Sequence, residues 1–281
     1  MNPYLKWPGG KARLAQNILG HVGPGSRLVE PFVGSAAVFL ASPFERALLA
    51  DLDADLVGLH SAVRDDVEAV LAEAGVLFVK SNNTPDSFQR LRVEFNAKTA
   101  SPVRQAALML YLNRHGFNGL WRRNGRGEFN VSFGAYKEPK VPVETLREAS
   151  SRLQGATLVR QSFEETFAQL GEGDAMYCDP PYAPLSETAN FAGYAGPGFG
   201  WEAQKRLAEL AASAAKEGTC VVVSNHDTPQ VRALYQDAFE PVRFVEVQVA
   251  RSIAASGERR KSVGEVFAVF EPAAQRLRSA A

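Results

Sequence analysis

Short runs of hydrophobic residues alternate along the chain with longer stretches in which apolar positions recur at a helical period. The short runs predict strands at residues 27–32, 46–50, 156–161, 174–178 and 219–224. Between the last two runs, one apolar helix face is marked by Leu207, Leu210, Ala211 and Ala214. Because strands and helices alternate, the pattern predicts an α/β fold with a mostly parallel sheet and helices on both faces.

The last two strands differ from the others. Residues 243–250 and 264–270 alternate between apolar and polar side chains, and the polar, basic segment 251–263 joins them. Since no helix separates these strands, we expect an antiparallel hairpin at one edge of the sheet.

Residues 54–155 interrupt the alternation of strands and helices. Helical patterns cover 54–74, 86–97 and 103–115. From 116 to 140 the periodicity fails, and five glycines, several aromatics and arginines follow no helical pattern. Long irregular segments within a compact domain are usually functional. The chain is therefore predicted to hold an inserted, mainly helical domain at 54–155, with a hairpin at 116–140, and an α/β domain made of residues 1–53 and 156–281.

Composition indicates a globular protein of a reducing compartment. The 281 residues are 46% hydrophobic, which excludes a disordered chain, and the cysteines Cys178 and Cys220 form no disulfide framework or CxxC pair. No uncharged apolar run approaches the ~18 residues of a membrane span, and the N-terminus lacks the apolar core of a signal peptide. We expect a soluble, cytoplasmic protein without a membrane partner.

The formal net charge of zero hides an uneven distribution of charges. Residues 45–75 carry eight carboxylates and two arginines, whereas residues 112–140 carry six cations and two anions. A second basic island, residues 251–261, contains Arg251, Arg259, Arg260 and Lys261. The basic islands are consistent with a polyanion-binding surface, but charge alone is equally consistent with a solvated surface.

Candidate binding residues stand where the first two strands end. Glu30 to Gly34 (EPFVG) ends the first strand, and its glycine allows a ligand to approach the backbone. Asp51 ends the second strand, about 20 residues later, where an acid commonly binds a ribose hydroxyl. Each feature alone is ordinary turn chemistry. At this spacing, the two together suggest a cofactor that contains adenosine.

The tetrapeptide Asp179-Pro180-Pro181-Tyr182 directly follows the strand 174–178. Its two prolines have no N–H and fix the backbone, so the carbonyls there only accept hydrogen bonds. The Asp179 carboxylate and the Pro180 carbonyl can accept both hydrogens of an exocyclic amine, and Tyr182 can stack on the ring. This combination is suited to holding an aminated planar base.

These motifs together resemble those of a known family. DPPY after an apolar strand, EPFVG after an earlier one, and the starting KWPGGK (Lys6–Lys11) look like the D12 class of DNA adenine N6-methyltransferases, in the alpha group. The similarity is closest to the Dam-type, GATC-methylating enzymes. It extends from about Lys6 to Phe270 and includes the segments 117–122, 126–131, 183–186 and 224–228.

The resemblance implies a Rossmann-like methyltransferase fold, S-adenosyl-L-methionine as cofactor, double-stranded DNA as partner and a DNA-recognition role for residues 54–155. It implies cofactor contacts for Trp7, Lys11, Glu30, Phe32, Gly34, Asp51 and Asp179, and a catalytic role for Asp179, Pro180, Pro181 and Tyr182. It implies DNA contacts for Lys6, Arg92, Arg114, Asn118, Leu120, Arg122, Asn124, Asn130, Tyr136 and Lys137. We also expect a monomer in the bacterial nucleoid or a phage-infected cell.

The chain departs from the family pattern at four positions. Ala36 replaces the second glycine of the cofactor turn, and Phe117 replaces a tyrosine. Ser132 and Ala135 stand where the recognition hairpin usually has a proline and an arginine. The last three departures lie in the recognition hairpin, so they bear on the recognition sequence more than on the chemistry.

Alternative functions remain open at this point. An amine clamp does not distinguish DNA from RNA, so RNA adenine methylation is one alternative, and a non-catalytic DNA-recognition protein is another. The sequence is equally compatible with a stand-alone, a phage or a restriction–modification enzyme. His21, His60, His115 and His226 show no metal-ligand spacing, so we expect each to be structural or part of the polar surface, and no metal to be needed. Cys178 is expected in the core rather than as a nucleophile.

Overall fold

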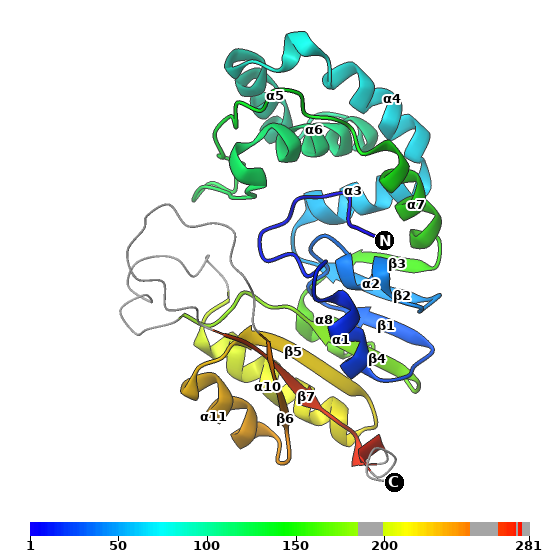
Figure 1. The fold of residues 1–281 in the computed structure, drawn as a ribbon, viewed down its shortest axis with the longest axis vertical. Coiled ribbons are helices and arrows are strands. Elements are labelled where there is room, and N and C mark those ends of the chain that lie inside the picture. Colours follow the sequence, from blue (N-terminus) through cyan, green and yellow to red (C-terminus); the bar gives the residue numbers. More distant parts are fainter. Residues whose placement is uncertain (185–198, 248–263, 274, 277–281) are drawn as a thin grey trace. The chain divides into compact units, whose positions relative to one another are not determined.

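The computed structural model describes residues 1–184, 199–247, 264–273 and 275–276 (Figure 1). The chain divides into two compact units. The first unit contains residues 1–16 and 33–160, and the second contains residues 17–32 and the described residues from 161 onward. The division falls within helix α1, Ala15–Val22. These units differ in their boundaries from the domains at 1–53, 54–155 and 156–281, which remain a prediction about function.

The second unit is built on a sheet with the strand order β1-β4-β5-β7-β6. Its strands are β1 (Arg27–Glu30), β4 (Asp174–Cys178), β5 (Cys220–His226), β6 (Arg243–Val247) and β7 (Glu265–Phe270). The first three pair in parallel, whereas β7 is antiparallel to both β5 and β6. The mostly parallel sheet with an antiparallel edge hairpin is therefore confirmed.

Burial explains why the central strands of this unit read as continuous apolar runs. Every residue of β4 is buried, and so is all of β5 except its last residue. Helix α10 (Trp201–Lys216) packs on β5 and β7 through a face that includes Leu207 and Ala211. Among its described residues, the unit also contains helices α8 (Phe163–Phe167) and α11 (Pro229–Ala238).

The first unit combines a parallel strand pair with a layer of helices. Strand β2 (Ala47–Asp51) pairs with β3 (Ala156–Arg160), so five of the seven described strands are parallel. The chain between them forms α3 (Ala54–Asp65), α4 (Val67–Leu77), η1 (Lys80–Asn82), α5 (Pro85–Ala97), α6 (Pro102–His115), η2 (Phe117–Gly119) and α7 (Val143–Leu153). Residues 54–155 are thus mainly helical. Helix α6 is the core of this layer, because it packs against α3, α4 and α5 (Figure 1).

Polar capping residues fix where these helices begin. The side chains of Asp53, Thr84 and Ser101 accept backbone N–H groups at the starts of α3, α5 and α6, and a proline follows two of these caps. The amphipathic segment 54–74 forms two helices, since Asp66 leaves the helical conformation and caps α4. Helix α2 (Ala37–Ala41) begins directly after Ala36, which has a left-handed φ of 55° and so cannot be part of the helix.

The hairpin segment 116–140 has little regular structure, as predicted. Isolated bridges join Gly116 to Phe133 and Arg123 to Phe129, and the Asn130 N–H donates to the Arg122 carbonyl over 3.1 Å. The predicted strand end 248–250, the basic segment 251–263 and the residues Leu185-Ser186 of the family-like segment lie outside the described residues.

Candidate cofactor, catalytic and DNA-recognition residues

A glycine turn and the acid at the end of β2 are joined within the first unit. Gly34 has a φ of +50°, and its N–H donates to the Asp51 carboxylate over 3.3 Å. A Cβ at Gly34 would lie 3.1 Å from the indole of Trp7, so a larger residue would displace the ring or the turn. Three residues predicted to bind the cofactor, Trp7, Gly34 and Asp51, therefore lie together.

A buried pair supports this turn from behind. His60 on α3 donates from Nε2 to the Gly34 carbonyl over 2.8 Å, and the Tyr4 hydroxyl donates to His60 Nδ1. Both side chains are fully buried, and burial lowers the pKa of His60 to about 4. The imidazole is therefore neutral at physiological pH, which leaves Nδ1 as an acceptor. The structural role expected for His60 is confirmed, and the contact is with the candidate site.

Asp51 is held in place but remains partly exposed. Its second oxygen accepts the Asp53 N–H over 3.0 Å. Burial raises the pKa of Asp51 to about 6, and the neighbouring Asp53 charge adds to this effect, although the N–H groups of Asp53 and Gly34 oppose it. A carboxylate with a raised pKa and an accessible edge is suited to accepting hydrogen bonds from a neutral donor such as a ribose diol.

The other predicted cofactor residues divide between the units. Lys11 is buried in the first unit, and its ammonium donates to the Gly9 carbonyl over 2.7 Å. Glu30 is buried at the end of β1 in the second unit. Phe32 stacks there on Phe163, with ring centroids 5.7 Å apart. Phe163 is not among the residues predicted to bind the cofactor.

The backbone of the Asp179–Tyr182 motif is clamped by buried amides. Gln204 on α10 donates to the Pro181 carbonyl over 2.8 Å. The Ala183 N–H donates to Asn225 Oδ1 over 2.9 Å. Asn225 in turn donates to Gln204 and to Tyr235, over 3.0 and 2.9 Å. Because both amides are buried and each bonds through its oxygen and its nitrogen, they hold the backbone of residues 181–183 in place.

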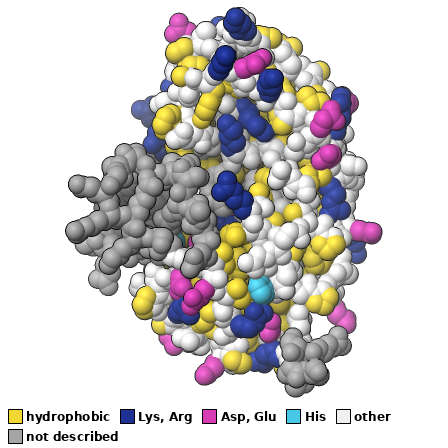
Figure 2. Space-filling model, in the orientation of Figure 1, with side chains coloured by type: hydrophobic (Ala, Val, Ile, Leu, Met, Phe, Trp, Pro, Cys, Tyr) yellow, Lys and Arg dark blue, Asp and Glu magenta, His cyan; other side chains and the backbone are white. Residues whose placement is uncertain are grey.

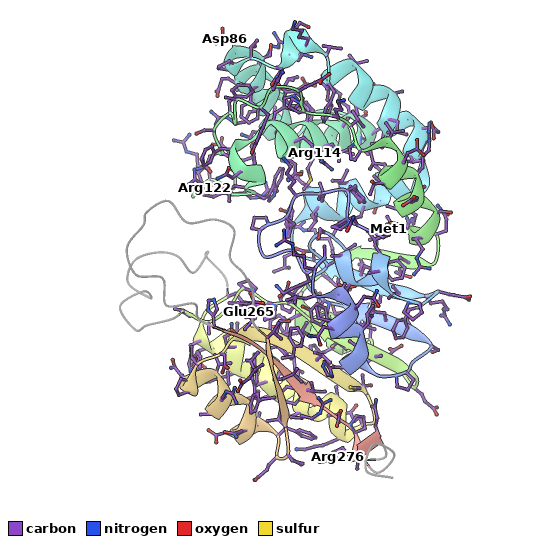
Figure 3. The ribbon with its side chains drawn as sticks, in the orientation of Figure 1. Met1, Asp86, Arg114, Arg122, Glu265 and Arg276 are labelled. Atoms are coloured by element: carbon purple, nitrogen blue, oxygen red, sulfur yellow. The ribbon has the colours of Figure 1, made fainter. Side chains whose placement is uncertain are left out.

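Tyr182 is oriented by two neighbours from the adjoining strands. Its hydroxyl donates to Glu265 Oε2 over 3.0 Å, and the His226 ring contacts it edge-on with centroids 4.9 Å apart. Figure 3 labels Glu265 where β7 begins. Burial raises the pKa of Tyr182, and the carboxylates of Asp179 and Glu265 raise it further. Tyr182 therefore stays neutral, as a stacking ring requires.

Cys178 and His226 of the second unit have the non-catalytic roles that are expected from the sequence. Cys178 is fully buried, and burial raises the pKa of its thiol well above the ordinary value. It therefore lies in the core, as predicted, and not in a nucleophilic setting. His226 donates from Nδ1 to the Ala183 carbonyl over 2.7 Å, which adds a third contact that holds the loop.

Sequence reasoning did not find Gln204 and Glu265, and it named Asn225 only within a family-like segment. Each lies on an element far along the chain from the motif that it holds. The available signal was weak: a buried-face glutamine on an amphipathic helix, and polar residues at the ends of β5 and β7. Polar residues on otherwise apolar faces mark such contacts.

Of the predicted DNA-binding residues, Arg122 and Asn130 are paired on the recognition hairpin. Asn130 Oδ1 accepts from Arg122 Nε over 2.9 Å, which orients an exposed guanidinium. Arg122 is labelled in Figure 3, where its side chain extends from the first unit. An arginine with its planar donors preset in this way suits bidentate recognition of guanine.

Three predicted DNA-binding residues line one groove of the first unit, namely Arg92, Asn124 and Asn130. Arg92 donates to the Val131 carbonyl over 3.2 Å, which ties α5 to the hairpin. Asn124 builds the hairpin turn, since its Oδ1 accepts the N–H groups of Arg126 and Glu128. The groove therefore joins residues from α5 and from both sides of the hairpin turn.

Lys6 lies near two other predicted DNA contacts, Tyr136 and Arg114. The Lys6 ammonium lies 4.6 Å from the centre of the Tyr136 ring, and the pKa of Lys6 is lowered by burial and by the charge of Arg114. Arg114 donates to the Tyr4 carbonyl over 2.6 Å. Asn118, Leu120 and Lys137 are exposed, and Asn118 has a left-handed φ of 53°. Figure 2 shows several lysine and arginine side chains on this unit's visible face.

Among the described residues, no group of three or more His, Cys, Asp or Glu side chains is arranged to hold a metal ion. No helix in the described ranges has the length and apolar character needed to cross a membrane.

A family model and similar relatives with known names agree on one family. The family model of the D12 class N6 adenine-specific DNA methyltransferases matches residues 7–253. The DNA adenine methylase of Vibrio cholerae is 44% identical over 270 residues, which are 96% of each chain. That of Escherichia coli K12 is 43% identical over 269 residues, 96% of this chain and 95% of the relative. That of Haemophilus influenzae is 43% identical over 272 residues, 95% and 93% of the two chains.

Among solved structures, the rRNA methyltransferase AviRa of Streptomyces viridochromogenes aligns with a TM-score of 0.38 and 12% identity. The alignment covers 94% of this chain and 86% of that chain. This similarity is too low to define a shared fold.

The clamp on the Asp179–Tyr182 loop predicts a large stability effect. Replacing Asn225 by alanine leaves three buried groups without their hydrogen-bond partner, namely the Gln204 amide, the Tyr235 hydroxyl and the Ala183 N–H. We therefore expect the free energy of unfolding to fall by about 3 kcal/mol. Urea denaturation measures this change. The control is Gln16→Ala, which removes one exposed amide contact to the Ala41 carbonyl and should change stability by less than about 0.5 kcal/mol. Equal effects of the two substitutions would contradict the clamp.

Proposed function

The chain belongs to the D12 class N6 adenine-specific DNA methyltransferase family, and from this premise we propose that it methylates adenine within GATC in duplex DNA, with S-adenosyl-L-methionine as donor. Its activity class is that of a DNA adenine N6-methyltransferase. The GATC assignment is supported by full-length similarity to DNA adenine methylases and by the family-like segments of the recognition hairpin.

The residues that fit the cofactor are those at the strand ends. Asp51 offers a partly exposed carboxylate for ribose hydroxyls, and Gly34 presents a backbone without a Cβ beside the Trp7 ring. We propose that these residues, with Lys11, Glu30 and Phe32, bind the donor. When bound, S-adenosylmethionine supplies an electrophilic methyl group on a sulfonium.

The observation that carries the catalytic proposal is the acceptor-only loop held by Gln204 and Asn225. Adenine N6 is a weak nucleophile because its lone pair is delocalised into the ring. The Asp179 carboxylate and the Pro180 carbonyl would accept its two hydrogens, which favours rehybridisation and stabilises positive charge developing on the nitrogen. Tyr182, held neutral against Glu265, would stack on the base.

The target base must leave the duplex to be reached by these groups. Base flipping costs a few kcal/mol, and we propose that the exposed side chains of Asn118 and Leu120 fill the space that it leaves. Arg122, oriented by Asn130, would read guanine. Lys6, Arg92, Arg114, Asn124, Asn130, Tyr136 and Lys137 would contact the remaining DNA surface. We propose a monomer that acts in the bacterial cytoplasm.

The test of this function is methyl transfer from labelled S-adenosylmethionine to duplexes that contain GATC, GTTC or scrambled sites. We expect label only on GATC, and we expect Asp179→Ala to abolish transfer while DNA binding persists. Label on other adenine sites would show that the hairpin, which contains Ser132 and Ala135, recognises a different base sequence. No transfer to any duplex, with transfer to structured RNA, would replace DNA by RNA as substrate.

The raised pKa of Asp51 predicts pH-dependent cofactor binding. Ribose hydroxyls stabilise the ionised carboxylate, so affinity requires loss of a proton whose pKa is about 6 in the free protein. As the pH falls from 7 to 5, we expect the affinity for S-adenosylmethionine to fall by about tenfold. Calorimetry without DNA measures this. In Asp51→Asn the affinity should be lower at pH 7 and independent of pH in this range. If the affinity of this variant depends on pH as strongly as that of the wild type, the pH dependence belongs to another group.

The arrangement of Arg122 predicts a loss of base discrimination. A bidentate contact to guanine contributes roughly 1–3 kcal/mol, so Arg122→Ala should lower the preference for guanine at one position of the site by about 5- to 150-fold. Methylation rates on singly substituted duplexes report this preference. The matched control is Arg126→Ala, which removes an equal charge from the same hairpin and should leave the base preference unchanged. An unchanged preference in Arg122→Ala would exclude guanine reading.

A further inference from the structure

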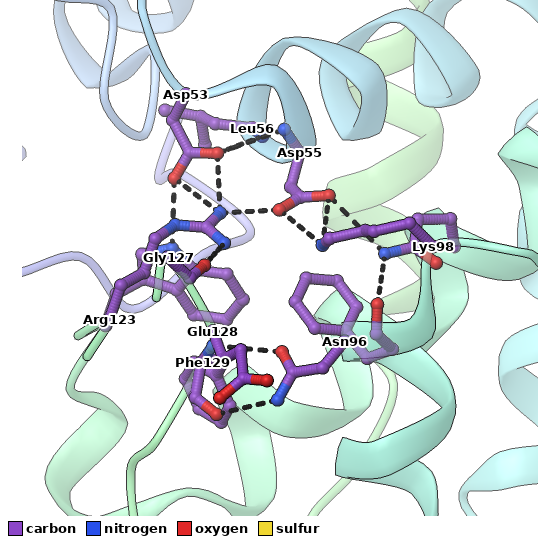
Figure 4. Close-up of polar contacts among 12 residues, drawn as sticks. Asp53, Asp55, Leu56, Asn96, Lys98, Arg123, Gly127, Glu128 and Phe129 are labelled. Atoms are coloured by element: carbon purple, nitrogen blue, oxygen red, sulfur yellow. Dashed lines mark hydrogen bonds and ion pairs between the residues drawn. The ribbon is translucent and has the colours of Figure 1, made fainter. Parts of the chain in front are cut away.

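Arg123 differs from the other arginines of the recognition hairpin because its charge is engaged inside the protein. Its Nη2 donates to both oxygens of Asp53, over 2.7 and 3.0 Å, and to Asp55 over 2.5 Å (Figure 4). The neighbouring residues Arg122 and Arg126 are exposed. Arg123 therefore faces α3, whereas its neighbours face solvent.

The three side chains of this cluster are largely buried. Those of Arg123, Asp53 and Asp55 are 26%, 19% and 12% exposed. Lys98 completes the cluster by donating to both oxygens of Asp55 over 2.7 Å. Two cations and two carboxylates thus balance each other, and charge-assisted contacts of this kind hold geometry more strongly than exposed ion pairs do.

Asp53 connects this cluster to the candidate cofactor acid. Its side chain caps α3 by accepting the N–H groups of Asp55 and Leu56. Its own backbone N–H donates to Asp51 Oδ1 over 3.0 Å. The residue that binds Arg123 is therefore the residue that orients Asp51.

A second contact from the hairpin reaches the same region independently. The Trp121 indole donates to Asp53 Oδ2 over 3.2 Å. Its ring centroid lies 6.0 Å from that of Trp7, which packs over Gly34. Two hairpin residues separated by one position, Trp121 and Arg123, thus contact the residues around Asp51. Arg122, which lies between them in the sequence, is exposed.

We propose that Arg123 is a positioning residue for the cofactor acid rather than a DNA contact, and that it couples the recognition hairpin to cofactor binding through Asp53. This inference deepens the proposed function and rests on the assignment of Asp51 to the cofactor ribose. When the hairpin holds Asp53 through Arg123, the Asp51 carboxylate is fixed for its ligand. By linkage, whatever fixes the hairpin, including bound DNA, tightens cofactor binding, and the reverse holds by the same factor.

Two substitutions remove the ion pair between Arg123 and Asp53 while keeping the fold. Asp53→Asn removes the charge but keeps a residue that caps helices as well as aspartate does, so α3 is retained. Arg123→Gln removes the other partner. The matched control is Arg147→Gln, which breaks the exposed pair of Arg147 with Glu68, 2.7 Å long, elsewhere in the same unit.

The first measurement is the affinity for S-adenosylmethionine without DNA, by calorimetry. We expect Asp53→Asn and Arg123→Gln to weaken binding by about five- to tenfold, a typical coupling factor, and Arg147→Gln to leave it unchanged. In steady-state assays KM for the cofactor should rise while kcat at saturating cofactor is kept. Unchanged cofactor affinity in both cluster variants would overturn the proposal.

The second measurement is the salt dependence of binding to a GATC duplex without cofactor. A phosphate contact contributes about 0.9 to the slope of log affinity against log salt concentration, so a DNA-contacting Arg123 would lose that amount in Arg123→Gln. We expect no change in this slope. A reduced slope would assign Arg123 to the DNA and overturn the proposal.

The third measurement compares sinefungin affinity with and without saturating duplex. The wild-type protein should bind this non-transferable analogue about fivefold more tightly on DNA, and Asp53→Asn should lose the gain. Equal gains in the two proteins would overturn the coupling. Wild-type methyl transfer tests the proposed function separately, because these affinities are measured without turnover.

Discussion

The proposed catalytic chemistry depends on a short stretch of backbone after β4 that can accept hydrogen bonds but cannot donate them. Pro180 and Pro181 carry no N–H, and the adjoining Asp179 is a carboxylate, so an exocyclic amine meets acceptors alone. This loop has no regular structure of its own. Its conformation is set by buried amides, through Gln204 on the Pro181 carbonyl and Asn225 on the Ala183 N–H. Polar groups buried among β4, β5 and α10 are thus tolerated because each is satisfied.

A second constraint organises the first unit, where three acids follow one another at the end of β2. Left uncompensated, Asp51, Asp53 and Asp55 would repel each other and raise each other's pKa. Cations from distant segments, Arg123 and Lys98, neutralise the last two, while Asp51 accepts the N–H groups of Gly34 and Asp53 and pairs with no cation among the described residues. The charges are therefore divided between Asp51, which we propose binds the cofactor, and two acids that attach the hairpin segment 116–140 to α3.

Much of the fold could be predicted because it follows from local patterns. The fully buried β4 and β5 read as apolar runs, α5 and α6 begin at capped prolines, and the β6–β7 pair follows from the missing helix. The contacts that position the site could not be predicted in this way. Gln204, Asn225 and Glu265 hold the loop from elements distant in sequence. The sequence pattern also does not distinguish Arg123 from its exposed neighbours. Only the fold determines which polar residues become partners.

The most direct test of the central claim is the chemical identity of the product. A GATC duplex treated with the protein and S-adenosylmethionine is digested to nucleosides and analysed by mass spectrometry. The acceptor-only loop predicts N6-methyl-2′-deoxyadenosine as the methylated nucleoside, and its absence after Asp179→Ala. Methyl groups on cytosine, or on a ring nitrogen of adenine, would contradict the claim that the loop clamps the adenine amine.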